Sequence, residues 1–211
     1  MLVIKQSEVN IGEIVKALKQ GKVIVYPTET CYGLGCDATN QSAVKKLFAI
    51  KHREENKPVL VLVSDIEMSK KYVQWSPMLE EMARKYWPGP LTIVAKVKNQ
   101  NTGLSAGVLG KDNTVAFRIS SHPFAGDLTK SLGCPLVSTS ANITAQASPY
   151  DILSVREMFN RTGLARRGSG AEPAEPDLVI DSGELPFCKP STIVRIVSDK
   201  MEVLRQGEVK I

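Results

Sequence analysis

The chain has 211 residues, of which 43% are hydrophobic and 23% charged, as in typical soluble globular proteins. This composition excludes a disordered chain, a collagen and a disulfide-stapled scaffold. Lysine and arginine number 27 against 22 acidic residues, and the resulting net charge of +5 favours anionic partners only mildly. The length fits one large or two small domains. Because no repeat or linker divides the chain, we predict a single domain over residues 1–211.

The sequence shows no sign of a membrane segment. No apolar run approaches the roughly 18 residues that a membrane-spanning helix needs. Residues 1–5 reach polar side chains at once, which argues against a signal peptide. The cysteines lack the spacing of zinc ligands, and we interpret them as free thiols: Cys31, Cys36, Cys134 and Cys188. We therefore expect a cytoplasmic protein without membrane contact.

The first predicted elements are helices and strands in alternation. Apolar residues recur at helical spacing over residues 11–20, where Asn10 can cap a helix and Gly21 can end it. Ser76 and Pro77 open another helix, since proline is favoured at the first helical position. The remaining elements of this half are a strand at 22–26, a helix at 44–51 and a strand at 58–63.

The second half continues the alternation. We predict a helix at 151–159 and strands at 91–97, 114–119, 135–138, 177–180, 191–197 and 201–205. Alternating helices and strands favour an α/β fold with a central, partly parallel sheet, and the two last strands, with no helix between them, make that sheet mixed. Residues 163–176 are rich in Gly, Pro, Arg and Ala, which predicts a surface loop and a candidate lid.

Histidine-based and phosphate-loop chemistries find little support. The chain has two histidines, His52 and His122, and contains neither G-x-S-x-G nor G-x-x-x-x-G-K-[ST]. Residues 33–38 match the loose dinucleotide pattern G-x-G-x-x-A, but the glycines neither follow a predicted strand directly nor open a helix. We therefore expect no dinucleotide site.

Polar side chains instead gather after predicted strands. Residues 27–35 place two hydroxyls, a carboxylate and a phenol after the first buried strand, Arg118 closes a later strand, and residues 138–142 follow another. Ligands of open α/β sheets bind outside the carboxyl ends of strands. A site rich in Lys, Arg, Ser, Thr and Asn suits a polyphosphate, because phosphoryl and nucleotidyl transfer need mainly positioning and charge neutralisation.

These motifs together resemble the YrdC-like family, over about residues 10–207. The resemblance is carried by six motifs in the family's order: Pro27-Thr-Glu-Thr-Cys-Tyr-Gly-Leu, Lys51-x-Arg53, Trp87-Pro-Gly-Pro-Leu-Thr, Ser138-Thr-Ser-Ala-Asn142, Pro190-Ser-Thr-Ile-Val194 and Leu204-Arg-x-Gly207. It implies a three-layer α/β fold with a central twisted mixed sheet flanked by helices. It also implies synthesis of L-threonylcarbamoyladenylate and pyrophosphate from L-threonine, bicarbonate and ATP, for modification of the adenosine beside the tRNA anticodon.

The resemblance assigns residues to this reaction. The family's K-x-R and S-x-N signature matches Lys51, Arg53, Ser140 and Asn142. The expected ATP contacts are Arg53, Lys57, Thr114, Asn142, Ser148 and Arg205, with Lys51 adding positive charge at the phosphates. The expected threonine contacts are Thr30, Arg118, Ser140 and Ser191. An arginine suits the substrate carboxylate because its planar fork binds carboxylate through two hydrogen bonds.

The implied mechanism needs no covalent enzyme intermediate. The threonine amine takes up bicarbonate to give a carbamate, whose oxygen attacks the α-phosphate while pyrophosphate leaves. ATP is then a substrate accompanied by Mg²⁺, and we expect no metal site in the protein and no tightly bound cofactor. Two positions depart from the family pattern: Glu54 stands where many members have proline, and Leu62 where some have a histidine in the threonine pocket.

The sequence leaves two alternatives open. One is a non-enzymatic RNA-binding module, which the net charge permits, although an aromatic content of 6% offers few side chains for base stacking. The other is a related carbamoyl-adenylate chemistry, as in the much longer hydrogenase-maturation carbamoyltransferases. For the leading hypothesis we expect a downstream threonylcarbamoyl transferase as partner, and tRNA or other RNA on a basic face.

Overall fold

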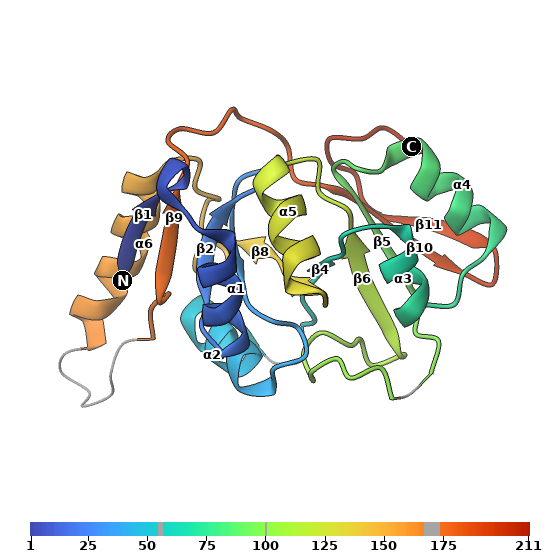
Figure 1. Cartoon of the computed structure of the whole chain (residues 1–211). Helices are drawn as coiled ribbons and strands as arrows, with labels where there is room; N and C mark the ends of the chain where they lie inside the picture. Colours follow the sequence, from blue (N-terminus) through green and yellow to red (C-terminus); the bar gives the residue numbers. More distant parts are fainter. Residues whose placement is uncertain (55–56, 100, 167–173) are drawn as a thin grey trace.

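The computed structural model describes residues 1–54, 57–99, 101–166 and 174–211. Its strands form two mixed sheets, which lie on the left and the right of Figure 1. The first sheet has the order β1-β9-β2-β3-β8, with β1 (Leu2–Lys5), β9 (Leu178–Asp181), β2 (Ile24–Pro27), β3 (Tyr32–Gly35) and β8 (Thr139–Ser140). The strands β1, β9 and β2 are parallel, whereas β3 runs antiparallel to both β2 and β8.

The second sheet has the order β11-β10-β5-β6-β4-β7. Its strands are β11 (Lys200–Arg205), β10 (Thr192–Val197), β5 (Leu91–Lys96), β6 (Thr114–Arg118), β4 (Val61–Leu62) and β7 (Leu136–Val137). The pairs β10–β5 and β4–β6 are parallel, and the other neighbours are antiparallel. The structure thus divides the predicted mixed sheet into two sheets and confirms the α/β fold class.

Helices flank both sheets. They are α1 (Ile11–Lys19), α2 (Gln41–Lys51), α3 (Ile66–Tyr72), α4 (Pro77–Tyr86), α5 (Pro123–Leu132) and α6 (Ile152–Arg166), with a short 3₁₀ turn η1 (Gln6–Glu8). Helix α1 begins as predicted, because the side chain of Asn10 accepts a hydrogen bond from the Gly12 backbone N–H at 2.9 Å. The helices α1 and α5 lie side by side in front of the first sheet (Figure 1) and bury leucines between them.

One hydrophobic core extends across both sheets. Tyr32 of β3 belongs to the same buried cluster as Phe117 of β6 and Phe159 of α6. A fully buried leucine or phenylalanine side chain contributes about 1.5–3 kcal/mol to folding. The two sheets are therefore held together by shared apolar packing, which fixes the position of one sheet relative to the other.

Several elements differ from the sequence prediction. The strand expected at 58–63 shortens to β4, and α6 runs on to Arg166, so the predicted loop at 163–176 begins as helix; its residues 167–173 lie outside the described ones. The elements β1, β3, β8, α3 and α5 were not predicted. In β3 the cause is glycine: a Cβ on Gly35 would lie 2.5 Å from the Val137 carbonyl oxygen, so only glycine fits this close strand contact.

Candidate active site

A polar cleft lies between the two sheets, with a volume of about 160 Å³. Both sheets and the loops that follow their strands contribute to its walls. The lining consists of Thr28, Thr30, Cys31, Gly33, Leu60, Arg118, Ser138, Thr139, Ser140, Ser148, Tyr150, Pro190, Ser191 and Arg205. Hydroxyls and guanidinium groups dominate this wall, as the sequence predicted.

The tight turn between β2 and β3 presents hydroxyls to the cleft. Thr28 Oγ1 donates to the Cys31 carbonyl at 2.7 Å and accepts from the Thr30 backbone N–H at 3.2 Å. These bonds fix the turn, and the Thr30 hydroxyl lies 3.1 Å from that of Thr28. Cys31 also lines the cleft, but burial raises the pKa of its thiol, so it stays protonated and is a poor nucleophile.

Arg118 is a buried cation at the end of β6. It is 3% exposed, and its Nη1 lies 3.3 Å from Glu29 Oε1. Within the described residues its Nε has no hydrogen-bond partner. A buried guanidinium with unused donors beside a hydroxyl-lined cleft is suited to bind an anionic ligand such as a carboxylate.

Lys51 points into the protein at the end of α2. Its Nζ donates to the carbonyls of Ser140 and Asn142 at 2.5 and 2.7 Å and to Asn142 Oδ1 at 3.0 Å. Burial and the positive charge of Arg53 lower the pKa of Lys51 to about 7. The amino group of this 2% exposed side chain lies within hydrogen-bond distance of three protein oxygens, so Lys51 anchors the segment that carries Ser140 and Asn142.

Ser140 and Asn142 are linked to each other as well. Ser140 Oγ donates to Asn142 Oδ1 at 2.6 Å, and Asn142 Nδ2 donates to the Gln146 carbonyl. Helix α2 ends at His52, whose φ of 50° lies in the left-handed region. This sharp end turns Arg53 away from the direction of Lys51, so the two basic residues of the K-x-R motif have different partners.

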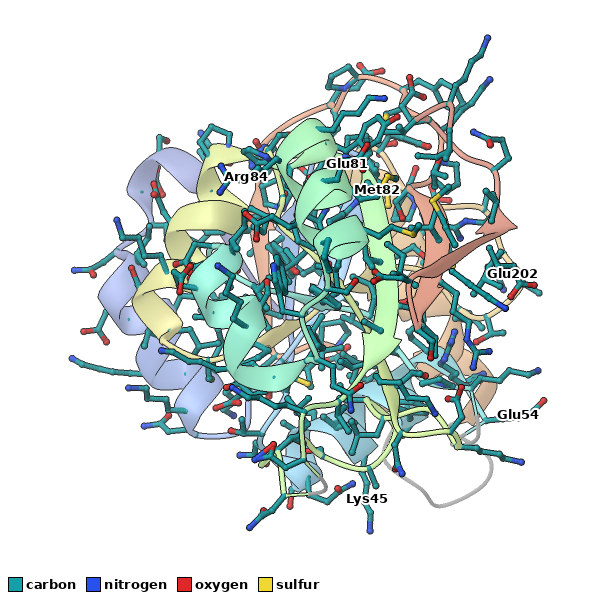
Figure 2. All side chains as sticks on the ribbon, turned by 90° about the vertical axis from the view of Figure 1, so that its right-hand side faces the viewer. Lys45, Glu54, Glu81, Met82, Arg84 and Glu202 are labelled. Atoms are coloured by element: carbon teal, nitrogen blue, oxygen red, sulfur yellow. The ribbon has the colours of Figure 1, made fainter. Side chains whose placement is uncertain are left out.

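Arg53 and Lys57, called the outer pair below, lie outside the cleft lining. Arg53 Nε and Nη2 donate to the carbonyls of Lys57 and Pro58 at 2.7 and 2.9 Å. Lys57 Nζ donates to Glu54 Oε1 at 3.0 Å, and both side chains are more than half exposed. Figure 2 shows Glu54 pointing away from the body of the molecule.

Ser191 and Arg205 meet at the opposite wall. Arg205 Nη2 donates to the Ser191 carbonyl at 2.7 Å and lies 3.1 Å from its hydroxyl. Thr92 Oγ1 lies 2.8 Å from the same hydroxyl and supports it from β5. The Ser191 hydroxyl therefore lines the cleft in a fixed position.

The structure brings most of the predicted site residues together. Six of them line the cleft: Thr30, Arg118, Ser140, Ser148, Ser191 and Arg205. Lys51 and Asn142 lie directly behind Ser140, whereas Thr114 stands at the other end of β6 from Arg118 and donates to Asp112 Oδ1 at 2.7 Å. Leu62 is buried in the cluster that α1 and α5 form and does not line the cleft described here.

Sequence reasoning did not single out Tyr150, and it included Glu29 only as the carboxylate of the polar cluster at residues 27–35. Glu29 stands inside the motif at residues 27–35, but nothing in the sequence pairs it with Arg118, which lies 89 positions later. Tyr150 lines the cleft and donates to the Cys188 carbonyl at 2.9 Å. Glu29 and Tyr150 both lie outside the helices and strands, where periodicity does not predict the direction of a side chain.

Two mixed sheets around a cleft of hydroxyls and guanidinium groups define an α/β protein with a cleft suited to a small anionic ligand. The family model for Sua5, YciO and YrdC, described as "Telomere recombination", matches residues 16–207. The chain belongs to this family, which confirms the resemblance seen in its motifs.

Individual relatives agree with this assignment. The "Threonylcarbamoyl-AMP synthase" of Vibrio vulnificus is 33% identical over 186 residues, which cover 82% of this chain and 98% of that protein. P. abyssi Sua5 complexed with L-threonine is 28% identical, with a TM-score of 0.79 over 98% of this chain; the match spans 57% of the Sua5 chain. E. coli YciO has the same fold, with a TM-score of 0.77, 24% identity and coverage of 98% and 94%. Among the described residues, no helix is long and apolar enough to cross a membrane.

Proposed function

We propose that this chain is a threonylcarbamoyl-AMP synthase, which converts L-threonine, bicarbonate and ATP into L-threonylcarbamoyladenylate and pyrophosphate. The product serves the threonylcarbamoyladenosine modification beside the tRNA anticodon. The curated relative of that name aligns over 98% of its length, and a Sua5 structure with 98% coverage of this chain holds L-threonine. The observation that carries the proposal is Arg118, a buried cation at a hydroxyl-lined cleft.

In this proposal the inner cleft receives threonine. Arg118 binds the α-carboxylate, because a guanidinium fork matches carboxylate geometry. Thr30, Ser140 and Ser191 offer hydroxyls for the polar groups of the substrate, and each is held by neighbouring hydrogen bonds. Such fixed donors and acceptors are ready before the ligand binds, which favours selectivity for a substrate with a hydroxyl.

The nucleotide contacts are proposed to start from Ser148 and Arg205 in the cleft. Arg53 and Lys57 reach the phosphates by exchanging the carbonyl and carboxylate oxygens that they contact here for phosphate oxygens. Asn142 is held in place by Lys51, which donates to its carbonyl and to its Oδ1. The role proposed for Lys51 is therefore the support of Ser140 and Asn142, beside the positive charge at the phosphates that the resemblance implies. Thr114 stays a predicted ATP contact.

The chemistry proceeds between substrates. The amine of threonine adds to the carbon of bicarbonate and water leaves, which gives the N-carboxylate. An oxygen of this carbamate then attacks the α-phosphorus of ATP, and the bond to the pyrophosphate oxygen breaks. The cationic cleft stabilises the negative charge that builds on the phosphoryl oxygens.

Magnesium is proposed to arrive with ATP. The described residues contain no group of three or more His, Cys, Asp or Glu side chains placed to hold a metal ion, and Glu29 is engaged by Arg118 and Ser120. Mg²⁺ in nucleotide sites is held largely by substrate phosphates and water. When bound, it would neutralise the triphosphate.

We further propose that residues 1–211 act as one catalytic domain in the cytoplasm and pass the product to a downstream transferase that modifies tRNA. The core shared by the two sheets supports the single domain. The four cysteines are all free, as is usual in a reducing compartment. A non-enzymatic RNA-binding role finds no support in relatives that are named as synthases.

The test is pyrophosphate release by the purified protein with MgATP, bicarbonate and a varied amino acid. We expect turnover that needs both L-threonine and bicarbonate. L-serine, which lacks the methyl group, should lose about 10- to 200-fold, and L-valine, an isostere without the hydroxyl, should lose more because buried polar partners stay unpaired. The proposal would be overturned if no pyrophosphate were released, or if its release did not depend on threonine.

A further inference from the structure

Glu29 and Arg118 form an ion pair that joins the two sheets beside the cleft. Glu29 lies in the turn between β2 and β3 of the first sheet, and Arg118 is the last residue of β6 in the second. Their side chains are 13% and 4% exposed, and Glu29 Oε1 lies 3.3 Å from Arg118 Nη1. Because little water or salt screens these charges, they hold each other more firmly than a surface pair would.

The second oxygen of Glu29 is also bound. Ser120 Oγ donates a hydrogen bond to Glu29 Oε2 and accepts one from the His122 backbone N–H at 3.2 Å. Ser120 comes two residues after Arg118, so both contacts of Glu29 go to the same short segment. The carboxylate is therefore fixed relative to the strand end that carries the guanidinium.

Arg118 lines the cleft, whereas Glu29 is not among the described residues that do so. Of the side-chain contacts of Glu29, the ion pair with Arg118 is the one that reaches a residue of the cleft lining. Nη1 faces Glu29 Oε1 in an ion pair without a hydrogen bond, and within the described part of the chain neither Glu29 Oε1 nor Arg118 Nε has a hydrogen-bond partner. This leaves donors of the guanidinium free for a second carboxylate.

We propose that Glu29 is a positioning residue, which fixes the guanidinium of Arg118 in the orientation that receives the α-carboxylate of L-threonine. The inference rests on the proposed function, because that function makes an amino acid the ligand of Arg118. Glu29 neither contacts the substrate nor exchanges a proton in the reaction. Its contribution is alignment, since a planar fork binds a carboxylate through two bonds only in one relative orientation.

Glu29 has two opposing effects on threonine binding, and an experiment can show which of them is larger. Glu29 also offsets part of the positive charge of Arg118, and this offset by itself would weaken the attraction for the substrate carboxylate. If alignment dominates, removal of the Glu29 carboxylate weakens threonine binding. If the charge offset dominates, the same removal strengthens it.

The experiment compares Glu29→Ala, Glu29→Gln and Ser120→Ala with the unmodified protein in the pyrophosphate assay. We expect Glu29→Ala to raise the KM for L-threonine about 10- to 100-fold, the effect of losing a charge-assisted contact, and to leave the KM for ATP within about two-fold. Glu29→Gln keeps an oxygen for Nη1 and should restore most of the loss. Ser120→Ala should give a smaller rise that is not additive with Glu29→Ala, because both act on one contact chain.

Three outcomes would overturn the positioning role. They are an unchanged or lowered KM for threonine in folded Glu29→Ala protein, an equal rise in the KM values of threonine and ATP, and a Gln variant no better than the Ala variant. Calorimetric titration of L-threonine into the same proteins makes the comparison without turnover. A failure of the synthase reaction is thereby distinguished from a failure of the positioning role. If Glu29→Ala does not fold, the Gln and Ser120 variants still decide the question.

Discussion

The inner and the outer cations of the site are held in different ways. Arg118 and Lys51 are 3% and 2% exposed, and each is bound to a segment far away in the sequence. Arg53 and Lys57, the outer pair, bond to groups within five residues of themselves. The inner cations are thus fixed before a ligand arrives, whereas the outer pair must exchange local partners. A fixed charge at the cleft, such as that of Arg118, stabilises a ligand or transition state more than a mobile one, because no reorganisation is needed.

The largest effect expected from this comparison is that of Arg118→Ala. It removes the proposed carboxylate ligand and leaves Glu29 buried without its counter-ion. We expect kcat/KM for L-threonine to fall on the order of 10³-fold, and the free energy of unfolding to fall by roughly 3–5 kcal/mol because a buried charge loses its partner. Steady-state kinetics and urea unfolding measure the two effects.

The matched control for this change is Arg118→Lys. Lysine keeps the charge near Glu29 but lacks the planar fork, so it should recover stability while recovering little of the threonine affinity. A lysine variant with normal threonine kinetics would show that charge alone, without fork geometry, binds the substrate. It would also mean that the orientation of Arg118 matters no more for binding than that of the outer pair.

The next effect is expected for Lys51→Met, which leaves the Ser140 and Asn142 oxygens without their donor. Three lost hydrogen bonds of about 1 kcal/mol each should lower kcat/KM for ATP by about 10- to 100-fold through a displaced Asn142. A fall confined to stability, with normal nucleotide kinetics, would instead mean that the segment keeps its place without Lys51.

Lys51 also predicts a pH dependence. Between its folded pKa of about 7 and its ordinary value of 10.5, the unfolded chain binds more protons at this group than the folded protein does. Its contribution to the free energy of unfolding therefore rises with pH across that window, by at most about 1.4 kcal/mol per unit. Chemical unfolding at pH 7 and pH 9 should show a gain in the unmodified protein relative to Lys51→Met. If the free energy of unfolding changed equally with pH in both proteins, Lys51 would stay charged in the folded protein.

This contrast marks the limit of what the motifs could predict at the site. The family resemblance indicated that Lys51 and Arg53 both lie near the phosphates, although residues two apart on a continuous helix do not share a face. The sequence predicted a helix that ends at Lys51, as α2 does, but it did not reveal that Lys51 turns toward the carbonyls of Ser140 and Asn142, about 90 positions later. Pairing across such distances depends on tertiary packing, which a local pattern does not encode.

The fold shows the same division between local and long-range signals. Helices with a cap and an apolar stripe, such as α1 and α4, were predicted close to their observed bounds because the signal lies within one segment. Strand β3 was missed because its glycines are required by contacts with Val137 and Tyr26, which lie elsewhere. Helix α3 was missed because it is short, although Asp65 caps it through the Met68 N–H at 2.7 Å.

The smallest effects are expected for the outer pair. Arg53→Ala should raise the KM for ATP about ten-fold at low salt, and Lys57→Ala only about three-fold, because Arg53 is partly buried whereas the exposed Lys57 is screened by solvent and loses side-chain entropy on binding. Neither should change the KM for threonine or the free energy of unfolding, since their present bonds are local and solvent-exposed. Raising the salt from 50 to 500 mM should reduce the increase in the KM for ATP in both variants. The loss of kcat/KM for L-threonine in Arg118→Ala should not change with salt. If the salt dependence were the same for all three variants, the inner and outer cations would not differ in the way that their burial implies.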